Sequence, residues 1–130
     1  MSRNVTLILL VDDSLTLQKR LQSSLESAGF AVEIASNGGE ALEKARQNQF
    51  DLVVTDEQMP IMSGHELCRR LRSDERYGHT PIIFLTAGRS KLDSNELLES
   101  LEVSAIFDKP FNPHEIVRFI EALPLIASGR

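Results

Sequence analysis

Residues 51–64 of the chain, DLVVTDEQMPIMSG, contain the junction that decides the fold. An apolar run over residues 52–55 stops at Asp56, a second acid follows at once, and Met59-Pro60 begins a turn. A short apolar run that is rich in valine is typical of a strand buried inside a parallel sheet. The stretch therefore predicts a buried strand that ends in a carboxylate, and Asp56 is either a surface acid at a turn or an acid with a chemical role.

Runs of the same kind recur along the chain and alternate with helical patterns. The predicted strands cover residues 6–11, 30–35, 51–55, 81–87 and 103–107. The predicted helices cover residues 15–28, 40–49, 64–73, 90–101 and 113–123. This alternation predicts βαβ units, and so an α/β fold with a parallel sheet and helices on both faces. We expect one domain over residues 1–124 and a short C-terminal tail over residues 125–130. The methionine at position 1 and the shortness of this tail favour a complete protein over a piece of a longer one.

The composition excludes several classes of protein. The chain of 130 residues has a formal net charge of −5, and its longest basic cluster is Arg69–Arg72, so we expect no direct contact with nucleic acid. No apolar run reaches the roughly 18 residues that cross a bilayer, and the N-terminus lacks a signal-peptide cleavage pattern. We therefore expect a cytoplasmic protein without membrane insertion. The single cysteine, Cys68, excludes an internal disulfide and is interpreted as a small buried hydrophobe.

Polar side chains follow four of the predicted strands, at the point where each strand ends. They are Asp12-Asp13, Asp56-Glu57, Thr86 and Asp108-Lys109. Because the carboxyl ends of parallel strands share one edge of the sheet, three aspartates, a hydroxyl and a lysine should converge there. Carboxylates about 4 Å apart repel by roughly 4 kcal/mol per pair near a protein surface, and a lysine with a hard divalent cation offsets that repulsion. This chemistry suggests phosphoryl transfer to a carboxylate.

Four motifs together resemble the receiver domain of two-component response regulators, the family that includes the chemotaxis regulators. They are LLVDDS, DLVVTDEQMPIMSG, PIIFLTA and FDKPF, and the resemblance covers residues 4–123. It implies a flavodoxin-like doubly wound fold, in which a five-stranded parallel sheet of strand order 2-1-3-4-5 has five helices on its two faces.

The resemblance also implies a role for each acid at the sheet edge. Asp56 matches the phosphoacceptor, and Asp12 and Asp13 match the acidic pair that holds Mg²⁺. In the family, the acceptor itself and the backbone carbonyl two residues after it, here that of Gln58, complete the protein's share of the metal site.

Three further positions match residues that act on the phosphoryl group or shape the site. Thr86 matches the switch hydroxyl that turns toward the phosphoryl group, and Lys109 matches the lysine that pairs with it. Pro110 matches a proline that a cis peptide bond commonly precedes. The implied protein is not an enzyme with a separate substrate, although it catalyses its own phosphorylation and dephosphorylation. Its implied partners are a sensor histidine kinase or a histidine phosphotransfer domain, a downstream protein target and, after phosphorylation, a second copy in a dimer.

The chain departs from the family at two positions. Three residues before the lysine the family usually has an aromatic ring that swings inward on activation, but here that position is Ile106 and the aromatic residue is Phe107. Because neighbours on a strand point to opposite faces, we interpret Phe107 as a core residue and expect the usual coupling to be altered. Glu102 stands where a glycine is common before the last strand.

Two alternative functions stay open at this point. The first is a receiver-fold interaction module that binds partners without phosphorylation, which Ile106 permits and the complete acid set opposes. The second is an Mg²⁺-dependent phosphatase with an aspartyl intermediate, which would need an acid where Gln58 stands.

Other polar residues are expected at the surface. This set is Glu57, His65, His79 and His114. Leu15 and Gln18 begin the first helix beside the same edge of the sheet, and they are interpreted either as part of a docking face for the donor kinase or as ordinary surface.

Overall fold

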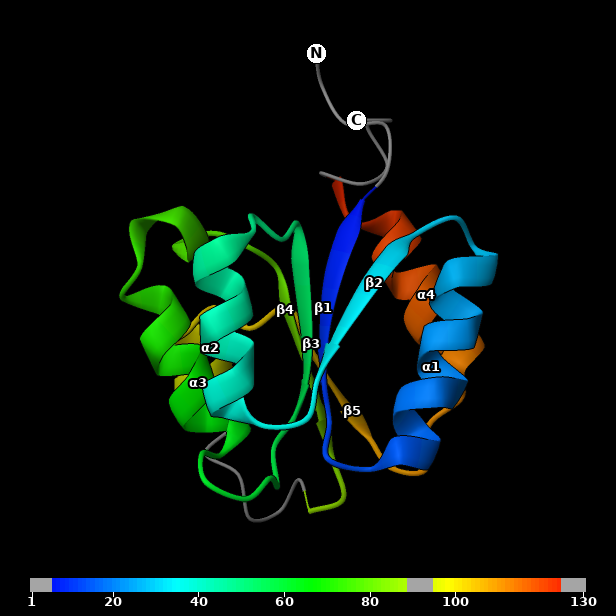
Figure 1. The fold of residues 1–130 in the computed structure, drawn as a ribbon, viewed down its shortest axis with the longest axis horizontal. Coiled ribbons are helices and arrows are strands. Elements are labelled where there is room, and N and C mark those ends of the chain that lie inside the picture. The colour runs from blue at the N-terminus through cyan, green and yellow to red at the C-terminus, as the bar shows by residue number, and fades with distance from the viewer. Residues whose placement is uncertain (1–5, 89–94, 125–130) are drawn as a thin grey trace.

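Five parallel strands form a sheet between two layers of helices in the computed structural model, which describes residues 6–88 and 95–124 (Figure 1). The strands are β1 (Leu7–Val11), β2 (Ala31–Ala35), β3 (Leu52–Asp56), β4 (Ile82–Thr86) and β5 (Ala105–Asp108). Their order across the sheet is β2-β1-β3-β4-β5, and every neighbouring pair is parallel. The predicted fold class and strand order are therefore confirmed.

Helices cover both faces of the sheet. The helical segments are α1 (Leu15–Ser27), α2 (Gly38–Gln47), α3 (Gly64–Arg72), η1 (Glu75–Tyr77), η3 (Glu96–Ser100) and α4 (Pro113–Ala122). α1 and α4 lie on one face, and α2 and α3 lie on the other (Figure 1). No helix in the described part of the chain has the length and apolar character that a membrane span requires.

The predicted helix over residues 90–101 is described only in its second half. Residues 89–94 lie outside the described residues. η3 is a turn of π-helix, which is wider than an α-helical turn, and the Leu101 amide donates to the Glu96 carbonyl five residues earlier. Leu97 is fully buried there, whereas Leu98 is 45% exposed. The two neighbours differ because adjacent residues of a helix point in different directions, and Leu97 takes the inward one.

Each face of the sheet buries its own apolar cluster, as expected when alternate strand residues point to opposite sides. Ile106 packs into the cluster that α2 and α3 cover. Phe107 packs into the other cluster, where its ring meets that of Phe119 edge-on at a centroid distance of 5.9 Å. Phe107 is thus partly buried against the core, on the face opposite to Ile106, which agrees with its interpretation as a core residue.

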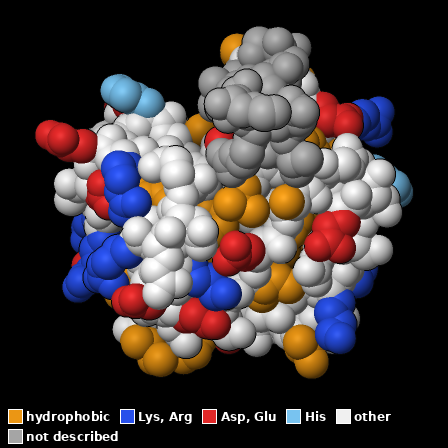
Figure 2. All heavy atoms as spheres, turned by 45° about the horizontal axis from the view of Figure 1, so that its top comes forward, with side chains coloured by type: hydrophobic (Ala, Val, Ile, Leu, Met, Phe, Trp, Pro, Cys, Tyr) orange, Lys and Arg blue, Asp and Glu red, His pale blue; other side chains and the backbone are white. Residues whose placement is uncertain are grey.

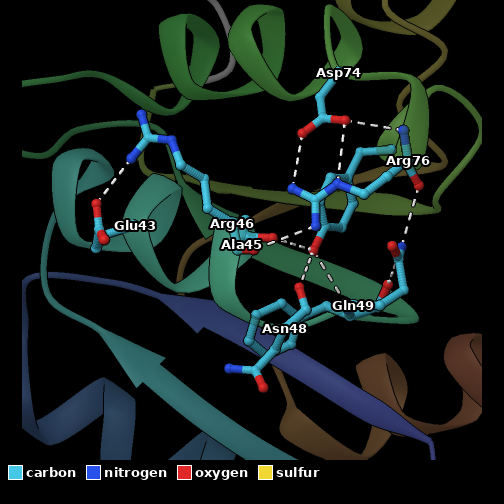
Figure 3. A network of polar contacts seen from close by, with 9 residues as sticks. Glu43, Ala45, Arg46, Asn48, Gln49, Asp74 and Arg76 are labelled. Atoms are coloured by element: carbon cyan, nitrogen blue, oxygen red, sulfur yellow. Dashed lines mark hydrogen bonds and ion pairs between the residues drawn. The ribbon is translucent and has the colours of Figure 1, made fainter.

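A network of polar contacts ties η1 to the C-terminal end of α2, at the amino edge of the sheet (Figure 3). The Tyr77 hydroxyl lies 2.9 Å from the Ala45 carbonyl oxygen and 2.6 Å from that of Asn48, and it accepts a hydrogen bond from the Phe50 amide. Arg76 pairs with Asp74 in the same network. On the neighbouring surface, acidic and basic side chains are interspersed (Figure 2). The amino edge is therefore fixed by contacts within the fold, and the predicted functional residues all lie at the carboxyl edge.

Glu102 has a left-handed backbone conformation, with φ of +54°. That conformation costs an L-residue roughly 1–2 kcal/mol and costs glycine little. This explains why glycine is common at this position in the family that the sequence resembles. The side chain contributes little in return, because its contact with the His79 ring is 3.9 Å long and both side chains are largely exposed.

Glu102→Gly is therefore expected to raise the free energy of unfolding by about 1 kcal/mol, since it removes this backbone strain. Glu102→Ala is the matched control: it removes the same side chain and keeps the strain, so it should bring no gain. Urea denaturation of the three proteins measures the difference. Equal stabilities of the glycine and alanine variants would contradict the prediction.

Candidate functional site

Three carboxylates meet at the carboxyl edge of the sheet. β1 pairs with β3 so that Val11 lies beside Thr55, and the next residue of each strand therefore brings Asp12 next to Asp56. One carboxylate oxygen from each of Asp12, Asp13 and Asp56 lies within 4.8 Å of the others. Asp12 and Asp56 are 1% and 3% exposed, whereas Asp13 is exposed. The convergence expected from the strand ends is therefore present in the fold.

Lys109 reaches into this cluster from the loop after β5. Its Nζ lies 3.1 Å from Asp56 Oδ1 and 3.7 Å from Asp12 Oδ2. The Lys109 amide donates to the Thr86 carbonyl at 2.7 Å, which fixes the start of the lysine against the end of β4. The peptide bond to Pro110 is cis, as the resemblance implied.

The cluster carries more negative charge than the lysine neutralises. Three carboxylates against one ammonium group leave two negative charges. Burial raises the pKa of both Asp12 and Asp56 above the ordinary value, and the nearby Lys109 ammonium opposes that rise. Asp12 Oδ2 is buried and accepts no hydrogen bond from any described residue. An unsatisfied buried carboxylate oxygen beside two other carboxylates is a donor set that suits a hard divalent cation such as Mg²⁺.

Thr86 and Gln58 lie where the sequence predicted them, on the same edge. Thr86 is the last residue of β4, its side chain is buried, and its Oγ1 accepts a hydrogen bond of 2.9 Å from the Gly88 amide. Gln58 lies two residues after Asp56 in the loop before α3, and its side chain is exposed. The Thr86 hydroxyl is thus hydrogen-bonded to the loop that follows β4.

Gly64, the first residue of α3, lies against the backbone of Asp56. A Cβ atom at position 64 would lie 2.3 Å from the Asp56 carbonyl oxygen, so only glycine allows this approach. The Gly64 amide donates to the Glu57 carbonyl at 2.9 Å, and the Thr55 hydroxyl donates to the Asp56 carbonyl at the same distance. The position of α3 and the backbone of the central acid are therefore fixed together, a contact that sequence reasoning missed.

Gln18 is a second residue whose role the sequence did not reveal. It was expected at the surface, but it is buried, and its side-chain amide donates to the Asp12 carbonyl and, at 3.3 Å, to Ser36 Oγ. It therefore holds the backbone that carries Asp12. Leu15, expected beside it on the surface, is 64% exposed.

Two of the four residues expected at the surface are at least half-buried. Glu57 accepts a hydrogen bond of 2.9 Å from the His65 amide, and burial raises the pKa of its carboxyl. The His65 side chain is only 17% exposed and lies against Glu96. His79 and His114 are exposed, as predicted.

Cys68 is fully buried on α3, and burial raises the pKa of its thiol to about 11. A protonated, inaccessible thiol is unreactive, and this confirms the interpretation of Cys68 as a small buried hydrophobe.

Comparisons with known proteins agree on one family. The family described as "Response regulator receiver domain" matches residues 8–121. The transcriptional regulatory protein ResD of Bacillus subtilis is 37% identical over 120 residues, which are 92% of this chain and 48% of ResD. This chain spans about half the length of the first curated relatives that it matches.

Solved structures show the same architecture. The chemotaxis protein CheY4 of Vibrio cholerae is 32% identical and superposes with a TM-score of 0.83 over 90% of this chain and 97% of its own. The receiver domain of the sensor histidine kinase PA1611 of Pseudomonas aeruginosa, solved with a magnesium ion coordinated in its active-site cleft, is 27% identical. Its TM-score is 0.79 over 90% of this chain and 95% of that domain.

Proposed function

Because the chain belongs to the response regulator receiver domains of two-component systems, we propose that Asp56 accepts a phosphoryl group from a histidine kinase or a phosphotransfer protein. The observation that carries this assignment is the position of Asp56. It is buried at the end of β3, within 4.8 Å of two other carboxylates and 3.1 Å from an ammonium group. The same acid set opposes the alternative of a module that works without phosphorylation.

The geometry gives each side chain a task in the transfer. A carboxylate oxygen of Asp56 forms the new bond to phosphorus as the bond from phosphorus to the donor imidazole nitrogen breaks, and that nitrogen keeps the electron pair. Lys109 already contacts Asp56 and is placed to pair with an oxygen of the incoming group. Positioning and charge neutralisation supply most of the catalysis in such transfers.

Mg²⁺ fits the same residues. Asp12, Asp13, Asp56 and the backbone carbonyl of Gln58 would hold it, and the bound ion would neutralise charge on the phosphoryl oxygens. The PA1611 receiver domain, which contains a magnesium ion in its cleft, supports this assignment. Gln18 would then act indirectly, since it fixes the backbone of Asp12.

Thr86 would couple phosphoryl transfer to a change in the conformation of the loop after β4, and so in the binding surface. Its hydroxyl now accepts a hydrogen bond from the Gly88 amide. Turning toward a phosphoryl group on Asp56 would break that bond and release the loop after β4, which is the logic of a local charge event that biases a larger element.

The partners in this proposal are those of the family. A histidine kinase or phosphotransfer domain donates the phosphoryl group, and a downstream protein, or a second copy of this chain, recognises the changed surface. The protein works in the cytoplasm and contacts neither nucleic acid nor membrane directly. It is not an enzyme with a separate substrate, but it catalyses its own phosphorylation and dephosphorylation.

The test is incubation with a small-molecule phosphodonor, followed by measurement of the intact mass. With Mg²⁺ we expect addition of one phosphoryl group on a peptide that contains Asp56, and with a chelator we expect none, because the two excess negative charges then repel the donor. Uptake that the chelator does not change would contradict the metal site. Failure both of labelling and of beryllofluoride binding would favour the phosphorylation-independent module, and turnover of many phosphate esters per chain would favour a phosphatase.

A further inference from the structure

α3 presents a polar face to η3. His65, Arg69 and Arg72 stand at spacings of four and three, which puts them on one side of the helix. Each of the three contacts η3 or the residues that follow it directly. The basic residues of α3 therefore serve a contact inside the fold, beyond any effect on the surface charge.

The first contact joins α3 to the start of η3. His65 Nε2 lies 2.6 Å from Glu96 Oε1, and Arg69 Nη2 lies 3.2 Å from the same oxygen. Although His65 Nε2 is buried, no described residue offers it an aligned hydrogen bond. The two atoms are therefore close but poorly aligned for a hydrogen bond, and the strength of their contact depends on where η3 lies relative to α3.

The second contact joins α3 to the end of η3. The Arg72 guanidinium donates to the Leu101 carbonyl at 2.7 Å and to the Glu102 carbonyl at 3.2 Å, and also to the Tyr77 carbonyl. One rigid helix thus holds both ends of a single turn of π-helix, a conformation that often marks functional sites.

The same helix begins at the phosphoacceptor. Gly64 lies against the Asp56 carbonyl so closely that a Cβ atom has no room, and the His65 amide is held by the Glu57 carboxylate. A shift of the Asp56 backbone therefore moves the first turn of α3, and with it the side chain that contacts Glu96.

We propose that α3 transmits the phosphorylation state of Asp56 to η3, and that the His65–Glu96 contact is the part that changes. This proposal rests on the proposed function. The contact exists in the arrangement in which Lys109 pairs with the free Asp56 carboxylate. Its loss on phosphorylation would make it a contact of the unphosphorylated state that opposes activation. Such a route supplies a path for the signal in a receiver that has Ile106 in place of the usual ring.

The test is a double-mutant cycle on the affinity for beryllofluoride with Mg²⁺, which mimics the phosphoryl group. The four proteins are the unaltered chain, His65→Ala, Glu96→Ala and the double variant. His65→Ala should tighten binding about five-fold, and adding it to Glu96→Ala should change nothing further, because Glu96→Ala already removes the His65 contact together with the Arg69 contact. By linkage, such non-additivity reports a contact whose strength differs between the two states, and a contact that is only structural does not produce it.

Glu43→Ala is the control. Glu43 is an exposed acid on α2 that pairs with Arg46 at 2.8 Å and accepts a hydrogen bond from Gln47 on the same helix, so its removal should leave the affinity unchanged. Amide exchange over residues 96–102 gives a second measurement: His65→Ala should exchange, without beryllofluoride, as fast as the unaltered protein does with it. Unchanged affinities or additive effects would overturn the relay alone. Failure of the unaltered protein to bind beryllofluoride would overturn the proposed function, and the relay with it.

Discussion

Asp56→Asn should take up no phosphoryl group from a small-molecule donor in the presence of Mg²⁺. The asparagine has nearly the same shape as the aspartate, but its neutral amide is no nucleophile, and it removes one of three carboxylates that lie within 4.8 Å of one another. Intact mass should therefore show one phosphoryl group on the unaltered chain and none on the variant, which is a complete loss of function at one position.

Glu57→Gln is the matched control for this substitution. It makes the same change from acid to amide one residue later, and the new amide oxygen can still accept the hydrogen bond from the His65 amide. Uptake should continue in Glu57→Gln. Uptake that persists in Asp56→Asn would move the acceptor to Asp12 or Asp13 and contradict the assignment.

Asp56→Asn should also be more stable than the unaltered chain when metal is chelated. Burial raises the pKa of Asp56 in the folded protein above its ordinary value of 3.8. Protonation of Asp56 therefore stabilises the folded state fully below pH 3.8, and this stabilisation is lost as the pH rises through the folded pKa. At pH 7 the ionised carboxylate consequently opposes folding. Asp56→Asn should then unfold at a higher urea concentration without Mg²⁺, and the difference should shrink when Mg²⁺ stabilises the unaltered chain.

Gly64→Ala should destabilise the fold by about 3 kcal/mol, a large effect for one added methyl group. The new Cβ atom would lie 2.3 Å from the Asp56 carbonyl oxygen and 3.1 Å from Glu57 Cα, and both are backbone atoms that no rotamer change can move away. Because relief requires a shift of the Asp56 backbone, phosphoryl uptake should also slow, by roughly 100-fold for a displacement near 1 Å. Urea denaturation and timed mass measurements check the two effects.

Gly78→Ala is the control for Gly64. Its backbone is already helical, with φ of −59°, and an added Cβ atom would meet only the Glu75 carbonyl oxygen at an ordinary distance of 3.7 Å. Its stability should change by less than about 0.5 kcal/mol. A Gly64→Ala protein as stable as Gly78→Ala would show that α3 can move away from Asp56 at little cost.

The fold and the meeting of the acids were predictable because their signals are local and repeated. Each strand is a short apolar run, and each of four runs ends in a polar residue, so the rule that parallel strands share a carboxyl edge is enough to bring Asp12 to Asp56. The cis bond before Pro110 was implied only by the family. The roles of these residues in phosphoryl transfer stay predictions that the labelling experiments address.

The contacts that hold the site in place were not predictable, because they join residues from different elements that no common sequence periodicity links. A glutamine beside a leucine on a first helical turn carries no sign that it will be buried under the Asp12 backbone, as Gln18 is. A histidine that is single in its helix is usually exposed, but His65 is largely covered, and Glu96 of η3 lies against it. Such contacts depend on how two elements approach each other, which neither pattern encodes.

The strand order also has a consequence for synthesis. β1 is synthesised before the other four strands of the sheet, although it lies in the interior between β2 and β3. One hydrogen-bonding edge of this strand therefore stays open until β3 has been made, through residue 56. Exposed strand edges and apolar surface favour association between nascent chains. The residue that we propose as the phosphoacceptor is therefore the last residue of the strand that covers this edge.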